Sequence, residues 1–136
     1  MPGNIGTAPI QNIGAYGTEI RDTLVSLKAI DIQTLEVKEF SNEDCSFGYR
    51  DSIFKNKVKG KYIIISVTFR LDKKNHKLKT QYGTIQLALD EMGIKGATIN
   101  DISNAVIKIR KEKLPNPAEL GNSGSFFKNP VIKTDH

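Results

Sequence analysis

The 136-residue sequence contains no tryptophan, a single cysteine and only two histidines. Because Cys45 has no partner in the chain, no internal disulfide can form, and we expect a protein of the reducing cytoplasm. The histidines and the cysteine lie far apart in the sequence, which excludes a recognisable metal-ligand spacing, so we expect no metal. No apolar run approaches the ~18 residues of a membrane span and the first residues lack a signal-peptide pattern, so we expect no membrane association.

Hydrophobic residues make up 38% and charged residues 26% of the sequence, which is typical of a globular protein, and the length fits one domain or one domain plus a piece of another. The net charge of +5 favours an anionic partner, either a nucleic acid or a phosphorylated small molecule. The lysines at positions 55–61 and 73–79 flank the apolar run of residues 62–69. They are not interleaved with aromatic residues, so we interpret them as solvated strand ends and expect no nucleic-acid partner.

Three segments are predicted to be strands from alternation and β-branched content: residues 24–32, 34–40 and 62–71. The third is almost continuously apolar, which predicts the centre of a sheet covered on both faces. Residues 41–45 begin with a serine and carry acidic residues, which predicts a helix start. Helices are also predicted over residues 84–92, stopped by Gly93, and after Thr98, whose capping box with Asp101 precedes an apolar face. Strands first and helices later predict an α+β fold with a mostly antiparallel sheet.

Two glycine-rich stretches remain. Residues 1–17 contain glycines and prolines that disfavour a regular strand, and we expect a loop with one short helical turn. Such a loop presents backbone N–H groups that suit a phosphate, although neither a P-loop nor a Rossmann fingerprint is present. In residues 121–130 we expect Ser125 on a tight turn before Phe126 and Phe127. Residue types alone leave two readings of it: an ordinary turn before a buried strand, or a hydroxyl placed to exchange a proton.

Four sequence words occur in one order along the chain: PIQNIGAYG at residues 9–17, FGYRDSIFK at 47–55, KLP at 113–115 and GSFFKNP at 124–130. Together they resemble the UDP-N-acetylenolpyruvoylglucosamine reductases (MurB) of bacterial cell wall synthesis, in the form that has a tyrosine loop. The resemblance runs from end to end of the chain. It implies an oxidoreductase that uses FAD and NADPH to reduce UDP-N-acetylglucosamine enolpyruvate to UDP-N-acetylmuramate. It also implies a second FAD-binding domain over residues 1–114 and the start of a substrate domain over 115–136.

The resemblance also implies roles for individual residues. Arg50 matches the arginine that binds and polarises the enolpyruvyl carboxylate, and Ser125 matches the serine that protonates the enol intermediate. Tyr82, Lys113 and Asn129 match substrate-contacting positions, with Tyr82 directed to the diphosphate. The loop residues that match flavin contacts, mostly through their backbone, are Gly6, Thr7, Gln11, Asn12, Gly14, Ala15 and Tyr16. From the residues themselves, Arg50 could instead be a surface arginine paired with Asp51, and Tyr82 a core aromatic.

The chain departs from the family at Ser123, where alanine is more common, and at Ser46, where a larger residue is common. It also lacks the family's N-terminal portion and the late glutamate that works with Arg50 and Ser125. We therefore expect an internal fragment, inactive alone, of an enzyme that is a monomer at full length. The alternative from another class is a basic binding module that has lost catalysis and binds polyanions without flavin.

Overall fold

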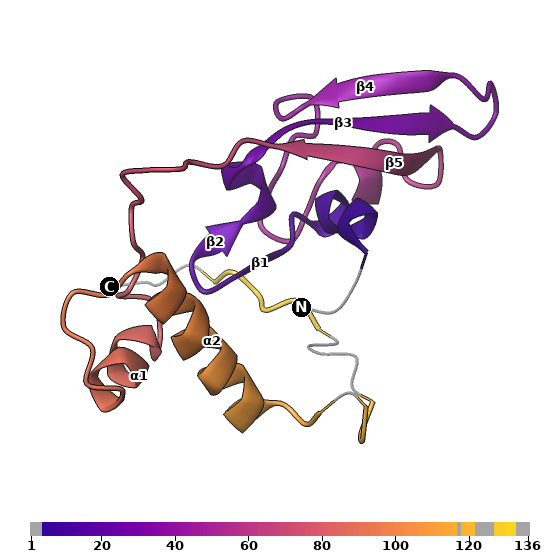
Figure 1. Ribbon diagram of the computed structural model, residues 1–136. Coiled ribbons are helices and arrows are strands. Elements are labelled where there is room, and N and C mark those ends of the chain that lie inside the picture. The colour runs from indigo at the N-terminus through magenta and orange to yellow at the C-terminus, as the bar shows by residue number, and fades with distance from the viewer. Residues whose placement is uncertain (1–3, 117, 122–126, 133–136) are drawn as a thin grey trace. The chain divides into compact units, whose positions relative to one another are not determined.

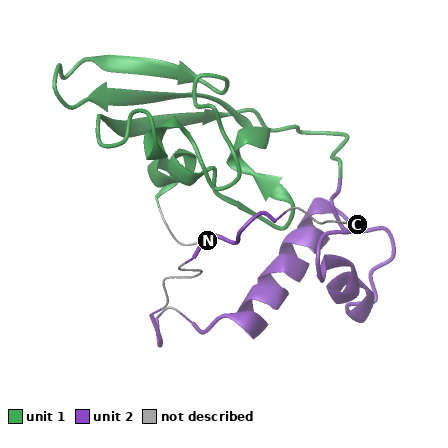
Figure 2. Ribbon diagram, turned by 180° about the vertical axis from the view of Figure 1, so that it is seen from behind, with its two compact units in different colours: residues 1–77 green, residues 78–136 purple. Residues whose placement is uncertain are grey.

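The computed structural model describes residues 4–116, 118–121 and 127–132. The chain forms two compact units, unit 1 over Met1–Lys77 and unit 2 over Leu78–His136 (Figure 2). The predicted domain boundary after residue 114 stays a prediction. Ser125 lies outside the described residues.

Unit 1 is built on a three-stranded antiparallel sheet in the order β4-β3-β5 (Figure 1). Strand β3 spans Leu24–Asp31, β4 spans Val37–Ser41 and β5 spans Tyr62–Phe69. All three strands were predicted from alternation and β-branched content. With the helices of unit 2, the antiparallel pairing confirms the predicted α+β class.

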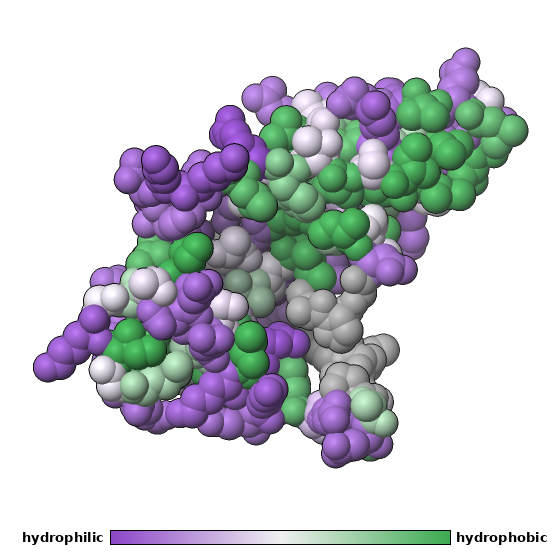
Figure 3. Space-filling model, in the orientation of Figure 1, coloured by the Kyte–Doolittle hydropathy of each residue, from purple (hydrophilic) through white to green (hydrophobic). Residues whose placement is uncertain are grey.

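The predicted position of the apolar run in β5 is wrong. β3 occupies the centre of the described sheet, and β5 lies at its edge. Ile63 and Ile65 keep 59% and 51% of their surface exposed, and apolar side chains gather over the sheet in Figure 3. A shift in register between Lys28 and Ala29 leaves Ile65 without a partner in β3. A continuous apolar run indicates strand character, but it does not say which neighbour lies beside the strand.

The core of unit 1 lies on the other face of the sheet. Phe40 of β4 packs edge-to-face against Phe54 and Tyr62, with ring centroids 5.2 and 5.1 Å apart. The buried core residues are Leu24, Leu27, Ala29, Phe40, Cys45 and Phe54. This core fixes the sheet against the loop that follows residue 45, which carries Arg50.

Ser41 ends β4 and residues 42–46 form a turn, so the helix start predicted at residues 41–45 is wrong. Ser41 and Asp44 do make the contacts of a helix cap: the Asp44 carboxylate accepts from the backbone N and hydroxyl of Ser41, each at 2.8 Å. These hydrogen bonds, led by the backbone one, hold the pKa of Asp44 below its ordinary value. The turn ends at Ser46, whose left-handed φ of 44° takes the chain out of the helical direction, so the turn does not continue into a helix.

The N-terminal stretch has more order than predicted. A seven-residue 3-10 helix, η1, spans Ile5–Gln11 and is followed by a hairpin of β1, Gly14–Ala15, and β2, Thr18–Glu19. Asn12 and Tyr16 have φ values of 44° and 53°, and these left-handed residues end η1 and turn the hairpin. Two shorter 3-10 helices follow, η2 at Ile20–Asp22 and η3 at Ile53–Lys55.

The described part of unit 2 contains two α-helices, α1 over Ile85–Glu91 and α2 over Ile99–Lys113. The predicted capping box is present, since Thr98 and Asp101 hydrogen-bond reciprocally at the start of α2. Gly93 has a φ of 70° after α1, as a glycine stop requires. No helix in the described part of the chain is long and apolar enough to cross a membrane.

Candidate functional site

Arg50 lies between β4 and η3, in the loop that follows the turn ending at Ser46. Its guanidinium is directed at the hairpin of β1 and β2. Its φ is 53°, a left-handed conformation that a side chain this large adopts only where neighbours hold it. Nη2 donates to the backbone oxygen of Gly14 at 2.6 Å. Nη1 is buried and has no hydrogen-bond partner among the described residues. The structure therefore brings together Arg50 and Gly14, which lie 36 positions apart in the sequence.

The Arg50 loop is tied down at several points. Gly48 and Asp51 exchange backbone hydrogen bonds of 3.1 and 3.3 Å, which closes the loop around Arg50. The buried Ser52 hydroxyl donates to the Ile10 carbonyl at 2.7 Å and so joins the loop to η1. Asp51 does not form the alternative ion pair with Arg50: its Oδ1 accepts from Ser52 N at 3.0 Å and from Asn56 Nδ2 at 2.8 Å.

Gly14 is needed by the protein's own packing. A Cβ at this position would stand 2.7 Å from Glu19 Cγ, 2.8 Å from the Thr18 backbone oxygen and 3.1 Å from Arg50 Nη1. The hairpin and the arginine therefore close around a residue without a side chain. The resemblance places a flavin contact at Gly14; the described structure adds an internal reason for the glycine.

Asn12 is completely buried at the junction of η1, the hairpin and the Arg50 loop. Its Nδ2 donates to Glu19 Oε2 and to the Gly48 carbonyl, both at 2.9 Å, and its Oδ1 accepts from Arg21 N at 3.1 Å. These hydrogen bonds of the Asn12 side chain are all made with other residues of the same chain. The Asn12 backbone N–H is also used internally, toward the Ala8 and Pro9 carbonyls, and its role as a flavin contact stays a prediction.

The other predicted flavin contacts differ in exposure. Thr7, Gln11 and Ala15 are exposed, while Gly6 and Tyr16 are half-buried. The Thr7 hydroxyl donates to the Asn4 carbonyl at 2.8 Å. A Cβ on Gly6 would stand 3.3 Å from the Ile64 carbonyl oxygen, so Gly6 lets η1 lie close to β5. Their role as flavin contacts stays a prediction.

Unit 2 carries the three predicted substrate contacts. Tyr82 precedes α1 and is 55% exposed, which is unlike a core aromatic. Lys113 is the last residue of α2 and is exposed, as is Asn129. Their side chains are available to a ligand, and their role stays a prediction.

Sequence reasoning missed Glu19, Arg21 and Ser52. Glu19 Oε2 accepts from Asn12 and from Arg21 Nε, the latter at 2.9 Å, and the Glu19 backbone N donates to Asp22 Oδ2 at 3.1 Å. These residues belong to no chemical motif. Their partners can lie far along the chain, as Ser52 and Ile10 do at a separation of 42 positions. No local pattern in the sequence marks such contacts.

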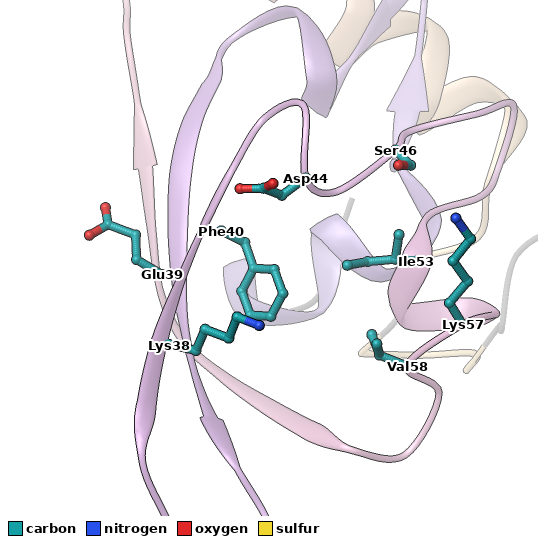
Figure 4. A pocket seen from close by; sticks show the side chains of 8 residues that line it. All are labelled: Lys38, Glu39, Phe40, Asp44, Ser46, Ile53, Lys57 and Val58. Carbon is teal, nitrogen blue, oxygen red and sulfur yellow. The ribbon is translucent and has the colours of Figure 1, made fainter.

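A hollow of about 330 Å³ opens beside β4 (Figure 4). Lys38 lies over the ring of Phe40, with Nζ 5.4 Å from the ring centroid, and Lys57 stands on the η3 side. Its lining residues are Lys38, Glu39, Phe40, Asp44, Ser46, Ile53, Lys57 and Val58. None of these is a predicted site residue.

Comparison with curated proteins gives close matches along almost the whole chain. The chain is 61% identical over 132 residues to the UDP-N-acetylenolpyruvoylglucosamine reductase of Flavobacterium johnsoniae, and the match covers 97% of this chain. It is 54% identical to the proteins of that name from Amoebophilus asiaticus and Pseudomonas savastanoi, again over 97% of this chain. The resemblance to the UDP-N-acetylenolpyruvoylglucosamine reductase family is confirmed.

The match to these reductases covers 39% of the length of the Flavobacterium johnsoniae and Amoebophilus asiaticus proteins. The chain thus spans well under half of these curated relatives. No protein-family model matches the sequence. A crystal structure of the Thermus caldophilus reductase overlaps 85% of this chain and 58% of its own at 19% identity, with a TM-score of 0.46. At that level the structural overlap adds no argument to the sequence match.

Proposed function

We propose that this chain forms part of the flavin and substrate site of a UDP-N-acetylenolpyruvoylglucosamine reductase. The reaction is the NADPH-dependent reduction of UDP-N-acetylglucosamine enolpyruvate to UDP-N-acetylmuramate, a step of peptidoglycan precursor synthesis in the cytoplasm. The observation that carries the proposal is the 61% identity over 97% of the chain with a protein of that name. The fixed position of Arg50 in the described structure supports it.

Arg50 is proposed to bind the enolpyruvyl carboxylate. Hydride addition to the enolpyruvyl double bond builds negative charge beside that carboxylate, and a guanidinium stabilises this charge without losing its own proton. A buried N–H without an acceptor costs free energy, of the order of 1–3 kcal/mol. An anion that reaches Arg50 Nη1 removes this cost, so the unpaired atom favours an anionic ligand here.

The exposed loop positions Thr7, Gln11 and Ala15 and the backbone around Gly14 are proposed to hold FAD. When bound, the flavin carries hydride equivalents from NADPH to the substrate. The tight closure of Arg50 on Gly14, at 2.6 Å, fits this arrangement, because it places the carboxylate-binding side chain next to the flavin loop.

The remaining roles belong to residues 78–136. Ser125 is proposed to protonate the enol intermediate that hydride addition leaves on the substrate, and it needs a geometry that favours transfer because serine is a weak acid. Tyr82, Lys113 and Asn129 are proposed to contact the diphosphate and sugar, for which a phenol, a cation and an amide are suitable groups. The full-length enzyme is proposed to be a monomer.

Titration of the purified chain with FAD, followed by flavin fluorescence, tests the flavin part of this proposal. We expect saturable one-to-one binding that Ala15→Glu weakens, because a bulky anion then stands among the proposed contacts of an anionic cofactor. Gln33→Glu is the matched control, since it adds the same charge to an exposed turn outside the loop. Absence of saturable binding, or equal weakening by both variants, would contradict the proposed contacts.

A further inference from the structure

Glu19 lies close to Arg50 without forming a hydrogen bond to its free nitrogen. Glu19 Cγ and Arg50 Nη1 stand 2.7 and 3.1 Å from the same point, the position of a Cβ on Gly14. Because both atoms lie this close to one point, Glu19 Cγ and Arg50 Nη1 must themselves be near each other. The carboxylate carbon of Glu19 is bonded directly to Cγ, so the carboxylate group also lies near Arg50. Nη1 nevertheless has no partner among the described residues. A buried cation and a nearby carboxylate attract each other strongly, so other contacts must hold the carboxylate in place.

Those contacts come from Asn12 and from η2. Glu19 Oε2 accepts from Asn12 Nδ2 and from Arg21 Nε, each at 2.9 Å. The backbone N of Glu19 also donates to Asp22 Oδ2 at 3.1 Å, which ties this residue to the start of η2. The carboxylate is thus directed to the η2 side of the hairpin.

Asn12 is itself fixed in one orientation. Its second Nδ2 hydrogen goes to the Gly48 carbonyl and its Oδ1 accepts from Arg21 N. With the amide reversed, its oxygen would face two acceptors, Glu19 Oε2 and the Gly48 carbonyl, which is unfavourable. The completely buried amide therefore presents only a donor to Glu19.

We infer that Asn12 is a positioning residue which, with Arg21, holds the Glu19 carboxylate away from Arg50 and keeps Arg50 Nη1 free for a substrate carboxylate. The inference rests on the proposed function of Arg50 as the group that binds this carboxylate. If Glu19 turned to Arg50, the resulting internal ion pair would compete with the substrate for the same N–H groups. The asparagine thus acts on binding through Glu19, without touching the substrate.

The geometric part is tested by crystal structures of the 136-residue chain carrying Asn12→Ala and Arg21→Gln. In each variant we expect Glu19 to turn and hydrogen-bond Arg50, at about 2.8 Å for such a charged pair. Arg21→Gln changes an exposed side chain, so it keeps the test available if Asn12→Ala fails to fold. A Glu19 carboxylate that stays on η2 in both variants would overturn the inference.

The functional part is tested by the affinity of the chain for UDP-N-acetylglucosamine enolpyruvate, measured by calorimetry. Asn12→Ala is expected to weaken binding about five- to tenfold, the equivalent of one hydrogen-bonded competitor. Adding Glu19→Gln to Asn12→Ala should restore affinity to that of Glu19→Gln alone, because an amide does not pair with Arg50 as a carboxylate does. If Asn12 only supports the fold, the double variant will bind as weakly as Asn12→Ala, and the inference is wrong.

The two tests separate this inference from the proposed function. Failure of the unmodified chain to bind the substrate, while Glu19 turns to Arg50 in the variant crystals, would reject the proposed ligand and leave the geometric role of Asn12 supported. Substrate binding that is indifferent to Asn12→Ala would reject the inference and leave the proposed function supported.

Discussion

At the residue scale, Cys45 shows how burial sets the chemistry of a single group. Its side chain has no exposed surface and belongs to the core of unit 1. Burial, with a smaller contribution from the charge of Asp44, raises the pKa of the thiol from 9.0 to about 11. Because a buried thiolate is disfavoured, this cysteine is expected to be inert at neutral pH.

The raised pKa of Cys45 predicts a loss of stability at high pH. The folded thiol holds its proton more tightly than the unfolded thiol does, so its contribution is complete below pH 9 and is lost as the pH rises through about 11. Over that window we expect the free energy of unfolding to fall by roughly 2 kcal/mol more than in Cys45→Ala, which has no thiol to ionise. Urea unfolding of both proteins between pH 8 and pH 11 measures the difference. Equal pH slopes would show that the thiol is not protected.

Asn12, Glu19 and Arg50 show a different property of single residues, namely that a contact far along the chain decides what a side chain is free to do. Asn12 and Gly48 are 36 positions apart, and Ser52 and Ile10 are 42 apart. Arg50 was predicted to be a site residue because it lies in FGYRDSIFK, one of the four motifs that resemble the reductase family. Its supporting residues were not predicted, since a hydrogen bond between distant segments leaves no periodicity and no spacing in the sequence.

At the scale of elements, the hairpin of β1 and β2 closes only because position 14 is a glycine. For Gly14→Ala we expect a loss of about 1–3 kcal/mol in unfolding free energy, since a Cβ there overlaps the Thr18 backbone and must displace it. Gly48→Ala is the matched control: it lies in the neighbouring loop, and the nearest atom to its Cβ would be Asp51 Cβ at 3.5 Å. Urea denaturation compares the two. Equal effects would mean that the hairpin adjusts freely.

The strands and helices were largely predictable from the sequence, but the order of the strands in the sheet was not. Alternation and β-branching predicted β3, β4 and β5, and the Thr98–Asp101 box predicted the start of α2, because these signals lie within one element. The place of β5 at the edge was missed, because an apolar run does not specify its partner. A helix start was predicted at residues 41–45 because Ser41 and Asp44 are suited to cap a helix, and they do make these contacts. The left-handed conformation of Ser46, which redirects the chain, is not apparent from its residue type.

At the scale of the whole molecule, the four sequence words that suggested the family are spread over both units, and the matches to the curated reductases cover 97% of the chain. The net charge of +5 suits the proposed substrate and cofactors, which carry phosphates. Since the chain spans 39% of the length of the Flavobacterium johnsoniae protein, the proposed reductase activity is best tested inside that larger protein.

The most direct measurement is the reductase activity of a chimera in which this chain replaces the matched stretch of the Flavobacterium johnsoniae protein. We predict enolpyruvyl-dependent NADPH oxidation by the chimera and none by the 136-residue chain alone. Arg50→Gln in the chimera should lower kcat/KM by at least about 10²-fold, because the group that meets the developing charge is removed. A folded, flavin-bound chimera that is inactive, or one whose activity does not depend on Arg50, would contradict the account.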